Sequence, residues 1–402
     1  MRLTVREKQK ATRITAARYQ RASKKKKGAI LDEFIELTGY DRCYASYLLK
    51  NHGRKIWINN KLRAIGDIRK KHKRQRQRIY GDDVLKPLKL IWAIMDCICG
   101  KRLRPMLKEM LTILQKHKEL KVTREIKKKL LRISAATIDR LLKPERKKYE
   151  LKGRALTKPG TLMKHQIPIR TFSEWDEQRP GFVEIDLVGH EGGNSYGDFI
   201  QTLNVTDVST GWTEMQAVKN KAEIWVFEAL KDIRTRLPFD LLGIDSDNGG
   251  EFINNHLIRF CQNENITFTR ARSYRKNDNC YVEQKNYTVV RRYVGYARYD
   301  TEAAQKLLNE LYGHLRLYVN FFQPVMKLIQ KTRIGSRVRK KYDKPQTPYQ
   351  RVLASSPVPE TKKQALREQY AQLNPAGLRR IIAKLQDKLL HLSEKSKNHP
   401  KR

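Results

Sequence analysis

Three acidic residues, in three different local settings, define the central part of this chain. Asp186 lies in the apolar segment 182–188, which predicts a strand, and Asp247 follows a second strand-like run, 239–244. Glu283 lies within the helical pattern 278–293. A few carboxylates can hold the pair of divalent cations that in-line phosphoryl transfer uses. Acidic residues are common, so it is their order, their settings and the 35 residues between Asp247 and Glu283 that favour a metal site.

The residues around these acids resemble a known family. Asp247 begins Asp-Asn-Gly, with Glu-Phe following at 251–252, and residues 276–286 read Lys-Asn-Asp-Asn-Cys-Tyr-Val-Glu-Gln-Lys-Asn. Over residues 175–355 the chain resembles the DD(35)E catalytic core of retroviral integrases, and residues 276–286 resemble the integrase-core transposases of bacterial insertion sequences. The resemblance implies an α/β RNase H-like core that cleaves and joins DNA without a covalent protein–DNA intermediate. It also implies two Mg²⁺ or Mn²⁺ ions per active site, held by Asp186, Asp247 and Glu283.

Two further acids compete with these positions. Glu184 has the same strand parity as Asp186, and Asp245 has the same parity as Asp247, so the strand pattern alone leaves both pairs open. The family motif selects Asp186 and the aspartate of Asp-Asn-Gly, Asp247. Glu184 and Asp245 are then interpreted as neighbours of the site.

The pattern of the core, residues 173–325, begins with strands and ends with helices. Segments 199–207 and 212–218 alternate around a turn, and with 182–188 they predict three antiparallel strands. The later elements are predicted as helix 221–237, strand 239–244, helix 251–264, strand 266–269, helix 278–293 and helix 301–321.

The charge of the chain indicates a polyanionic partner. Lys and Arg number 85 against 42 Asp and Glu, a formal net charge of +43, which serves attraction rather than folding. We expect double-stranded DNA, as element ends and target, and a homo-oligomer on that DNA. A ribosomal or membrane-surface protein is the alternative, but neither needs the three acids. We expect no small-molecule substrate and no membrane partner.

The five cysteines show no paired spacing, so we expect no structural zinc site, in contrast to the N-terminal zinc module of retroviral integrases. Their use fits a reducing bacterial cytoplasm, where we expect association with the nucleoid. The longest apolar run, 90–95, is too short to cross a bilayer.

The N-terminal range 1–82 is predicted as a basic arm, residues 1–27, and a first helix-turn-helix at 28–50. Asp41 is expected to cap the second helix, whose Arg42 and Tyr44 are candidate DNA contacts. A plain helical hairpin is the alternative, and the basic context favours DNA.

A second helix-turn-helix is predicted at 122–143, within a helical range 83–143 that is followed by a linker, 144–172. Ser134 is expected to cap its second helix, with Thr137 and Arg140 facing outward as candidate DNA contacts. Two such modules would read a longer element end, and residues 1–143 are expected to fold and bind without the core.

Further DNA contacts follow from the resemblance, because in integrases the helix with the third acid touches DNA ends. The candidates are Arg272, Lys276, Asn279, Lys285 and Arg291. A solvated basic face is the alternative. Residues 326–402 are predicted as a basic DNA-binding tail followed by helices, of which the stripe Leu378, Ile381, Leu385 and Leu389 is either a packing face or a protomer contact.

Together these features predict a DNA transposase or integrase that binds the ends of a mobile element. Two alternatives stay open. One is a catalytically inactive, transposase-derived DNA-binding protein, against which the presence of all three acids argues. The other is an RNase H-like nuclease, which would not need the helix-turn-helix modules and the basic tail.

Overall fold

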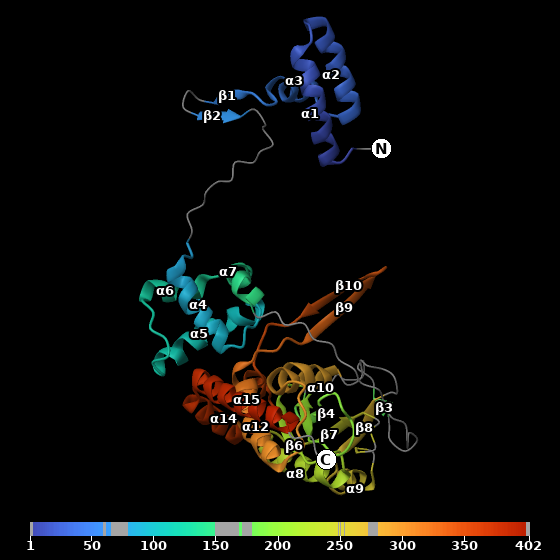
Figure 1. The fold of residues 1–402 in the computed structure, drawn as a ribbon, viewed down its shortest axis with the longest axis vertical. Helices are drawn as coiled ribbons and strands as arrows, with labels where there is room; N and C mark the ends of the chain where they lie inside the picture. The colour runs from blue at the N-terminus through green and yellow to red at the C-terminus, as the bar shows by residue number, and fades with distance from the viewer. Residues whose placement is uncertain are drawn as a thin grey trace. The chain divides into compact units, whose positions relative to one another are not determined.

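The computed structural model describes residues 3–58, 62–65, 79–148, 169–170, 179–247, 249, 251–252, 254–271 and 280–398 (Figure 1). The chain divides into an N-terminal unit, Met1–Ile79, and a large unit, Tyr80–Arg402. Each is described by itself.

The N-terminal unit holds three helices and a hairpin. Residues 1–27 do not form the predicted arm, because α1 covers Val5–Arg21 and the four lysines 24–27 begin α2. The Thr4 hydroxyl accepts from the Glu7 N–H and the Glu7 carboxylate accepts from the Thr4 N–H, and this capping box starts α1. The elements are α1 Val5–Arg21, α2 Lys24–Thr38, α3 Arg42–Asn51, β1 Lys55–Ile58 and β2 Leu62–Ile65.

A small apolar core joins the three helices. Ala16 of α1 packs with Phe34 of α2 and Leu49 of α3, and all three are buried. The Asp41 carboxylate accepts from the backbone N–H groups of Cys43 and Tyr44, which confirms the predicted cap of α3.

Four helices open the large unit: α4 Asp82–Ile94, α5 Gly100–Lys116, α6 Arg124–Arg132 and α7 Ala135–Lys148. Gly100 allows α5 to approach α7, since a Cβ there would lie 2.2 Å from the Ala135 carbonyl oxygen. Pro105 lies inside α5.

These helices share one core with the sheet, so the expectation that residues 1–143 form a self-contained segment is wrong. The α4–α5 turn is bound by the last turn of α12 (Glu302–Phe322) and the residue that follows it. Tyr318 Oη donates to the Ile94 carbonyl (2.5 Å) and Gln323 Nε2 to the Met95 carbonyl (3.2 Å). Both contacts join residues that are far apart in the sequence, so no local sequence pattern predicts them.

The central sheet has the order β3-β8-β7-β4-β5-β6. Strands β4, β5 and β6 are antiparallel neighbours, while β7 and β8 run parallel to β4. This confirms the three predicted antiparallel strands, within a mixed sheet. The strands are β3 Ile169–Arg170, β4 Phe182–Gly189, β5 Gln201–Asp207, β6 Thr213–Val218, β7 Gly243–Ser246 and β8 Thr267–Ala271.

Helices cover both faces of the sheet. Helix α8 (Glu223–Arg236) contacts β5 and β6 on the face of Gln216, to which Arg236 donates. The opposite face is contacted by a continuous helical run that begins at Cys280 and ends at Val294. Its parts are α10 Cys280–Lys285, the π-helical η2 Asn286–Arg291 and α11 Arg292–Val294; α9 spans Asn255–Asn263.

The outer strand β6 has its edge occupied by side chains of α12. Asn309 Oδ1 accepts from the Ala217 N–H (2.7 Å), and Asn320 accepts from the Thr213 N–H and donates to its carbonyl, both at 2.9 Å. Backbone groups that would otherwise be open to another strand are thereby satisfied.

We therefore expect Asn320→Leu to lower the free energy of unfolding by about 2–4 kcal/mol. The Asn320 side chain is fully buried, and Leu has the same branched shape and the same number of heavy atoms but no polar atom, so the change leaves a buried N–H and a buried carbonyl of Thr213 unpaired. Urea unfolding checks this, with Asn263→Leu, at an exposed position of α9, as control. Equal midpoints for Asn320→Leu and the wild type would contradict it.

The C-terminal elements are β9 Leu328–Ile334, β10 Arg337–Tyr342, α13 Pro348–Ala354, α14 Glu360–Gln372 and α15 Pro375–Asn398. Helix α15 packs on α12. The predicted stripe is thus a packing face within the chain: Leu378, Leu385 and Leu389 are buried, while Ile381 is exposed and Ile382 takes its place.

Candidate active site

Asp186 lies in β4 and is partly exposed. Its Oδ1 accepts from the Leu187 N–H (2.8 Å) and its Oδ2 from the Asn286 amide (2.6 Å). Both oxygens are therefore oriented, one by the strand itself and one by the helical run that carries Glu283.

Asp247 follows β7 and comes beside Asp186. Ile185 pairs with Ser246 in the parallel β4–β7 ladder, so the next residue of each strand is the acid. Asp247 Oδ1 accepts from the Gly249 N–H (2.9 Å), which turns the chain back after the strand. Asn248 of the motif lies outside the described residues.

Glu283 is exposed on α10, whose start is held by a buried acid of the sheet. Glu184 Oε2 accepts from the Val282 N–H at 2.8 Å. Because Val282 precedes Glu283, this bond fixes the third acid relative to β4.

The electrostatics of Asp186 report this proximity. Burial raises the pKa of Asp186 to about 7, and the negative charges of Asp247 and Glu283 add to the increase. Burial also raises the pKa of Asp247, and burial followed by the charge of Asp247 raises that of Glu251. A cluster of carboxyl groups that repel one another is stabilised by protons or by cations.

The donor set fits a hard divalent cation. Asp186, Asp247 and Glu283 offer only oxygen ligands, which Mg²⁺ prefers, and Mg²⁺ takes one or two carboxylates together with substrate phosphates. Among the residues that the structure describes, no three of the types His, Cys, Asp and Glu are grouped closely enough to hold one ion. The acids alone therefore do not form a closed cage, and substrate oxygens would have to complete the coordination.

Glu184 and Asp245 occupy the interior rather than the surface of the site. They are cross-strand neighbours and fully buried, and Thr269 Oγ1 donates to Asp245 at 2.5 Å. Burial, and then the charge of Asp245, raises the pKa of Glu184 well above its usual range. Both are placed as supports of the sheet and of α10, as the sequence interpretation expected for neighbours.

Glu184→Gln should therefore keep activity within about tenfold of the wild type. The pKa of Glu184 is raised, so its side chain resembles the neutral amide, and Gln can still accept from Val282. Asp245→Asn tests the other neighbour in the same DNA cleavage assay. An inactive Asp245→Asn beside an active Asp247→Asn would move the site by two residues.

Asn286 is a functional candidate that sequence reasoning missed. It donates to Asp186 and accepts from Asn204 Nδ2 at 2.7 Å, so it connects the acid to β5. It lies at the start of η2, and π-helical turns often occur at functional sites. Its spacing from Glu283, three residues along one helix, was the available signal.

Lys285 is not the exposed DNA contact that was predicted. It is buried, and burial together with the charge of Arg102 lowers its pKa to about 7. Arg102 belongs to α5 and donates to the Pro324 carbonyl (2.5 Å), which ties α5 to the segment after α12. Arg291 stays partly exposed and lies over the ring of Tyr296 at 4.8 Å. The candidates Arg272, Lys276 and Asn279 lie outside the described residues.

The candidate contacts on the helical modules are exposed or partly exposed. Ser134, Thr137 and Arg140 form a hydrogen-bonded row along the start of α7: the two hydroxyls are 2.9 Å apart, and Arg140 donates to Thr137 at 3.1 Å. In the N-terminal unit, Arg42 is paired with Asp32, and Tyr44 is exposed. Their contacts with DNA stay predictions.

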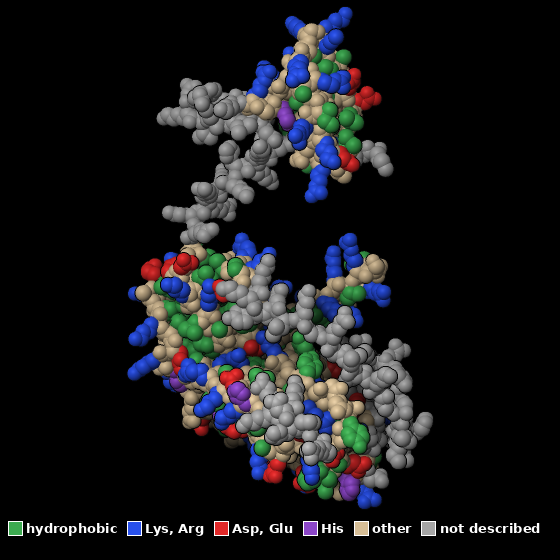
Figure 2. All heavy atoms as spheres, viewed as in Figure 1, with side chains coloured by type: hydrophobic (Ala, Val, Ile, Leu, Met, Phe, Trp, Pro, Cys, Tyr) green, Lys and Arg blue, Asp and Glu red, His purple; other side chains and the backbone are tan. Residues whose placement is uncertain are grey.

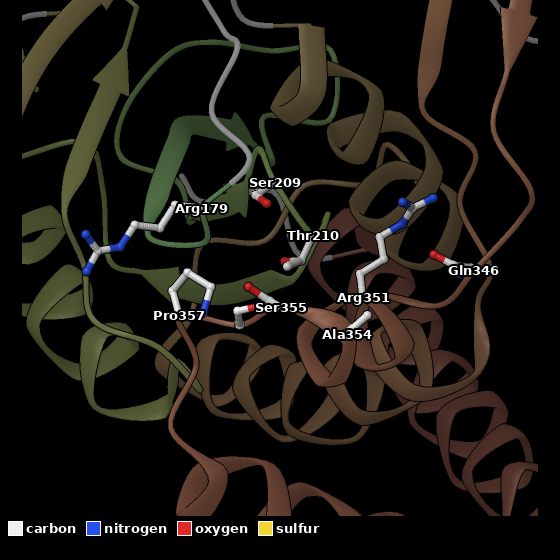
Figure 3. Close-up of a pocket in the computed structure, with 9 residues that line it drawn as sticks. Arg179, Ser209, Thr210, Gln346, Arg351, Ala354, Ser355 and Pro357 are labelled. Carbon is white, nitrogen blue, oxygen red and sulfur yellow. The ribbon is translucent and has the colours of Figure 1, made fainter.

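A cavity of about 450 Å³ lies elsewhere in the large unit (Figure 3). The arginines that line it do not converge on it: Arg351 donates to Asp343 (2.6 Å), and Figure 3 shows the guanidinium groups of Arg179 and Arg351 directed away from each other. It contains none of the predicted acids. The lining residues are Arg179, Ser209, Thr210, Gln346, Arg351, Ala354, Ser355, Ser356 and Pro357.

Lys and Arg side chains are spread over the visible face of both units (Figure 2). None of the described helices is long and apolar enough to span a membrane.

The chain has a sequence relative over most of its length. It is 39% identical over 334 residues to the uncharacterized protein y4rM of Sinorhizobium fredii (strain NBRC 101917 / NGR234), covering 83% of this chain and 91% of that protein. No family model matches the chain.

Among solved structures, similar chains come from retroviral integrases. The BIV integrase catalytic core has a TM-score of 0.29 at 15% identity, covering 47% of this chain and 98% of that one. The HTLV-2 integrase catalytic core in complex with magnesium has a TM-score of 0.28 at 15% identity, covering 37% of this chain and 91% of that one. A chain of a simian T-cell lymphotropic virus intasome in complex with the PP2A regulatory subunit B56 gamma has a TM-score of 0.31 at 14% identity. The match covers 46% of this chain and 73% of that one. The fold of this chain is defined by the strand order of its central sheet.

Proposed function

Because the chain belongs to the same family as the uncharacterized protein y4rM of Sinorhizobium fredii, whose name states no activity, we propose its function from the site itself. We propose that it is a DNA strand transferase of the transposase and integrase type. The observation that supports the proposal is positional: the parallel β4–β7 ladder brings Asp186 beside Asp247, and the bond from Val282 to Glu184 holds α10, which carries Glu283, against β4.

In this proposal Asp186, Asp247 and Glu283 are the ligands of two Mg²⁺ or Mn²⁺ ions. When bound, the cations would supply Lewis-acid activation of water and of the attacking hydroxyl, and charge stabilisation at the scissile phosphate. Asn286 keeps Asp186 in one orientation, and Glu184 keeps α10 at a fixed distance from β4.

The remaining polar surface would bind the substrate. Phosphate contacts by Lys and Arg would position the duplex, while Arg140 and its hydroxyl neighbours on α7, and Arg42 and Tyr44 on α3, would read base edges. The partner is double-stranded DNA, element end and target alike, bound by a homo-oligomer of the chain.

The test is a strand-transfer assay. Full-length protein is incubated with Mg²⁺, a supercoiled plasmid and labelled duplexes from the DNA flanking its gene. We expect the label to become joined to the plasmid through the 3′ end of the duplex, and only when the duplex carries an element end. Nicking of RNA–DNA hybrids without joining would instead favour an RNase H-like nuclease. Binding without any cleavage would favour an inactive DNA-binding descendant.

A further inference from the structure

The β9–β10 hairpin is an arm that is anchored only at its base. The Lys327 N–H donates to Asp343 Oδ1 (2.7 Å), and the Asp343 N–H returns a bond to the Lys327 carbonyl (2.9 Å). Arg351 holds Asp343 at 2.6 Å, and Val325 pairs with Gln346 just below. These contacts fix the place where the arm leaves the large unit.

Beyond this base nothing in the described part of the unit covers the arm. Every residue from Ile329 to Tyr342 is exposed, and the two strands pair only with each other. They are joined by a two-residue turn whose first residue, Gly335, has φ of 59°. Figure 1 shows the hairpin extending away from the helices and the sheet. A two-stranded hairpin with neither face packed is only marginally stable in water. The arm therefore contributes little to the core, and a binding partner would stabilise it.

Its charge is of one sign. Residues 328–342 include six Lys and Arg and no Asp or Glu, and the hairpin is blue without red in Figure 2. Lys331 and Lys340 stand directly opposite each other, a like-charge pair that destabilises an isolated hairpin. An anionic partner would remove this repulsion.

The register distributes these cations over both faces. Paired residues share a face, and faces alternate along each strand. We call the two sets face one and face two. Face one carries Arg337, Arg339 and Lys341, and face two carries Lys331, Arg333 and Lys340.

A ribbon with three cations on each face fits a partner with negative charge on both sides. A flat anionic surface would neutralise one face only. A duplex groove has a row of phosphates along each wall, and the major groove, about 12 Å wide, admits a two-stranded ribbon, whereas the minor groove, about 6 Å wide, does not. The exposed side chains of Ile334 and Val338, near the turn, are of a kind that can contact thymine methyl groups at the groove floor.

We propose that the β9–β10 arm enters the major groove of double-stranded DNA, with face one toward one sugar–phosphate strand and face two toward the other. The proposal takes the partner, DNA, from the function proposed above. To the basic DNA-binding tail predicted from the sequence it adds the hairpin as the element that binds, its mode of insertion and an equal share for the two faces.

The test compares three triple variants of the full chain, each losing three charges. One changes Arg337, Arg339 and Lys341 to Gln, and one changes Lys331, Arg333 and Lys340 to Gln. The control changes Lys362, Lys384 and Lys388, which are exposed on α14 and α15. Dissociation constants for a 40-base-pair duplex are measured in EDTA at several NaCl concentrations. Each phosphate contact contributes about 0.9 to the slope of log K against log [NaCl]. We expect each face variant to lower the slope by about 2–3, and the control by much less.

A loss confined to one face would overturn groove insertion, and a slope unchanged in both face variants would overturn the arm as a DNA contact. Competition with small ligands places the groove: methyl green, which occupies the major groove, should release the wild type, and netropsin, which occupies the minor groove, should not. The reverse result would overturn the assignment. Circular dichroism confirms that the variants stay folded. Because binding is measured without metal, a failed arm leaves the strand-transfer result standing, and an inactive wild type leaves the slopes standing.

Discussion

Asp186→Asn, Asp247→Asn and Glu283→Gln should each lower strand transfer about a thousandfold or more, while DNA binding persists. Each change removes one anionic oxygen ligand from a site whose proposed cations must neutralise charge at the scissile phosphate. Several kcal/mol of transition-state stabilisation correspond to a factor of this size. Binding should hold or strengthen, because each variant removes a negative charge near the DNA.

The measurement is the initial rate of joined product at saturating Mg²⁺, beside the dissociation constant for the same duplex. Asp240→Asn, an exposed aspartate ahead of β7, is the matched control and should retain the wild-type rate. Strand transfer at the wild-type rate by any one of the three variants would remove that residue from the site.

Asp186→Asn should at the same time make the folded protein more stable at pH 8 in the absence of metal. The pKa of Asp186 is about 7 in the folded chain against an ordinary value of 3.8, so the folded state prefers the protonated form. Below pH 3.8 Asp186 is protonated in both states and does not lower the free energy of unfolding. The loss of stability grows as the pH rises to 7 and is complete above pH 7. A shift of this size amounts to at most about 4 kcal/mol.

The amide can be accommodated by reversing its neighbours. Asn286 would turn its oxygen toward the new amide and its NH₂ group toward Asn204, whose Oδ1 is buried and has no partner in the wild type. Thermal unfolding without metal should therefore show a higher Tm for the variant at pH 8 and a difference less than half as large at pH 5. Mg²⁺ should raise the Tm of the wild type at pH 8 and leave that of the variant nearly unchanged. A wild type that is the more stable protein at pH 8 without metal would refute the electrostatic account.

The strands of the sheet and the helix that carries Glu283 could be predicted because their signals are local. Strand alternation, the turn between β5 and β6, and the motif around Glu283 each occupy a few consecutive residues. The prediction of an arm over residues 1–27 was wrong, because two local signals favour a helix in spite of the basic charge. These signals are the Thr4–Glu7 capping box and the apolar spacing that buries Ala16.

Other errors came from contacts that no short window contains. A lysine on a helix is usually exposed, whereas Lys285 is buried, and the charge of Arg102, about 180 positions earlier in the chain, helps to lower its pKa. Asn286 was quoted within the motif but had no role until β4 and β5 supplied Asp186 and Asn204. Tertiary docking decided both cases.

The bonds from α12 to the α4–α5 turn also set a scale of length. Helix α7 and the acids belong to one unit joined by these bonds, so the protein would act as a ruler between the bases that α7 reads and the phosphate that is cut. Inserting two base pairs between those positions should turn the recognised bases about 70° around the DNA axis and stop cleavage, as ten to ten and a half base pairs make one turn. Cleavage of a nested series of spaced duplexes would show which bases lie on the ruler.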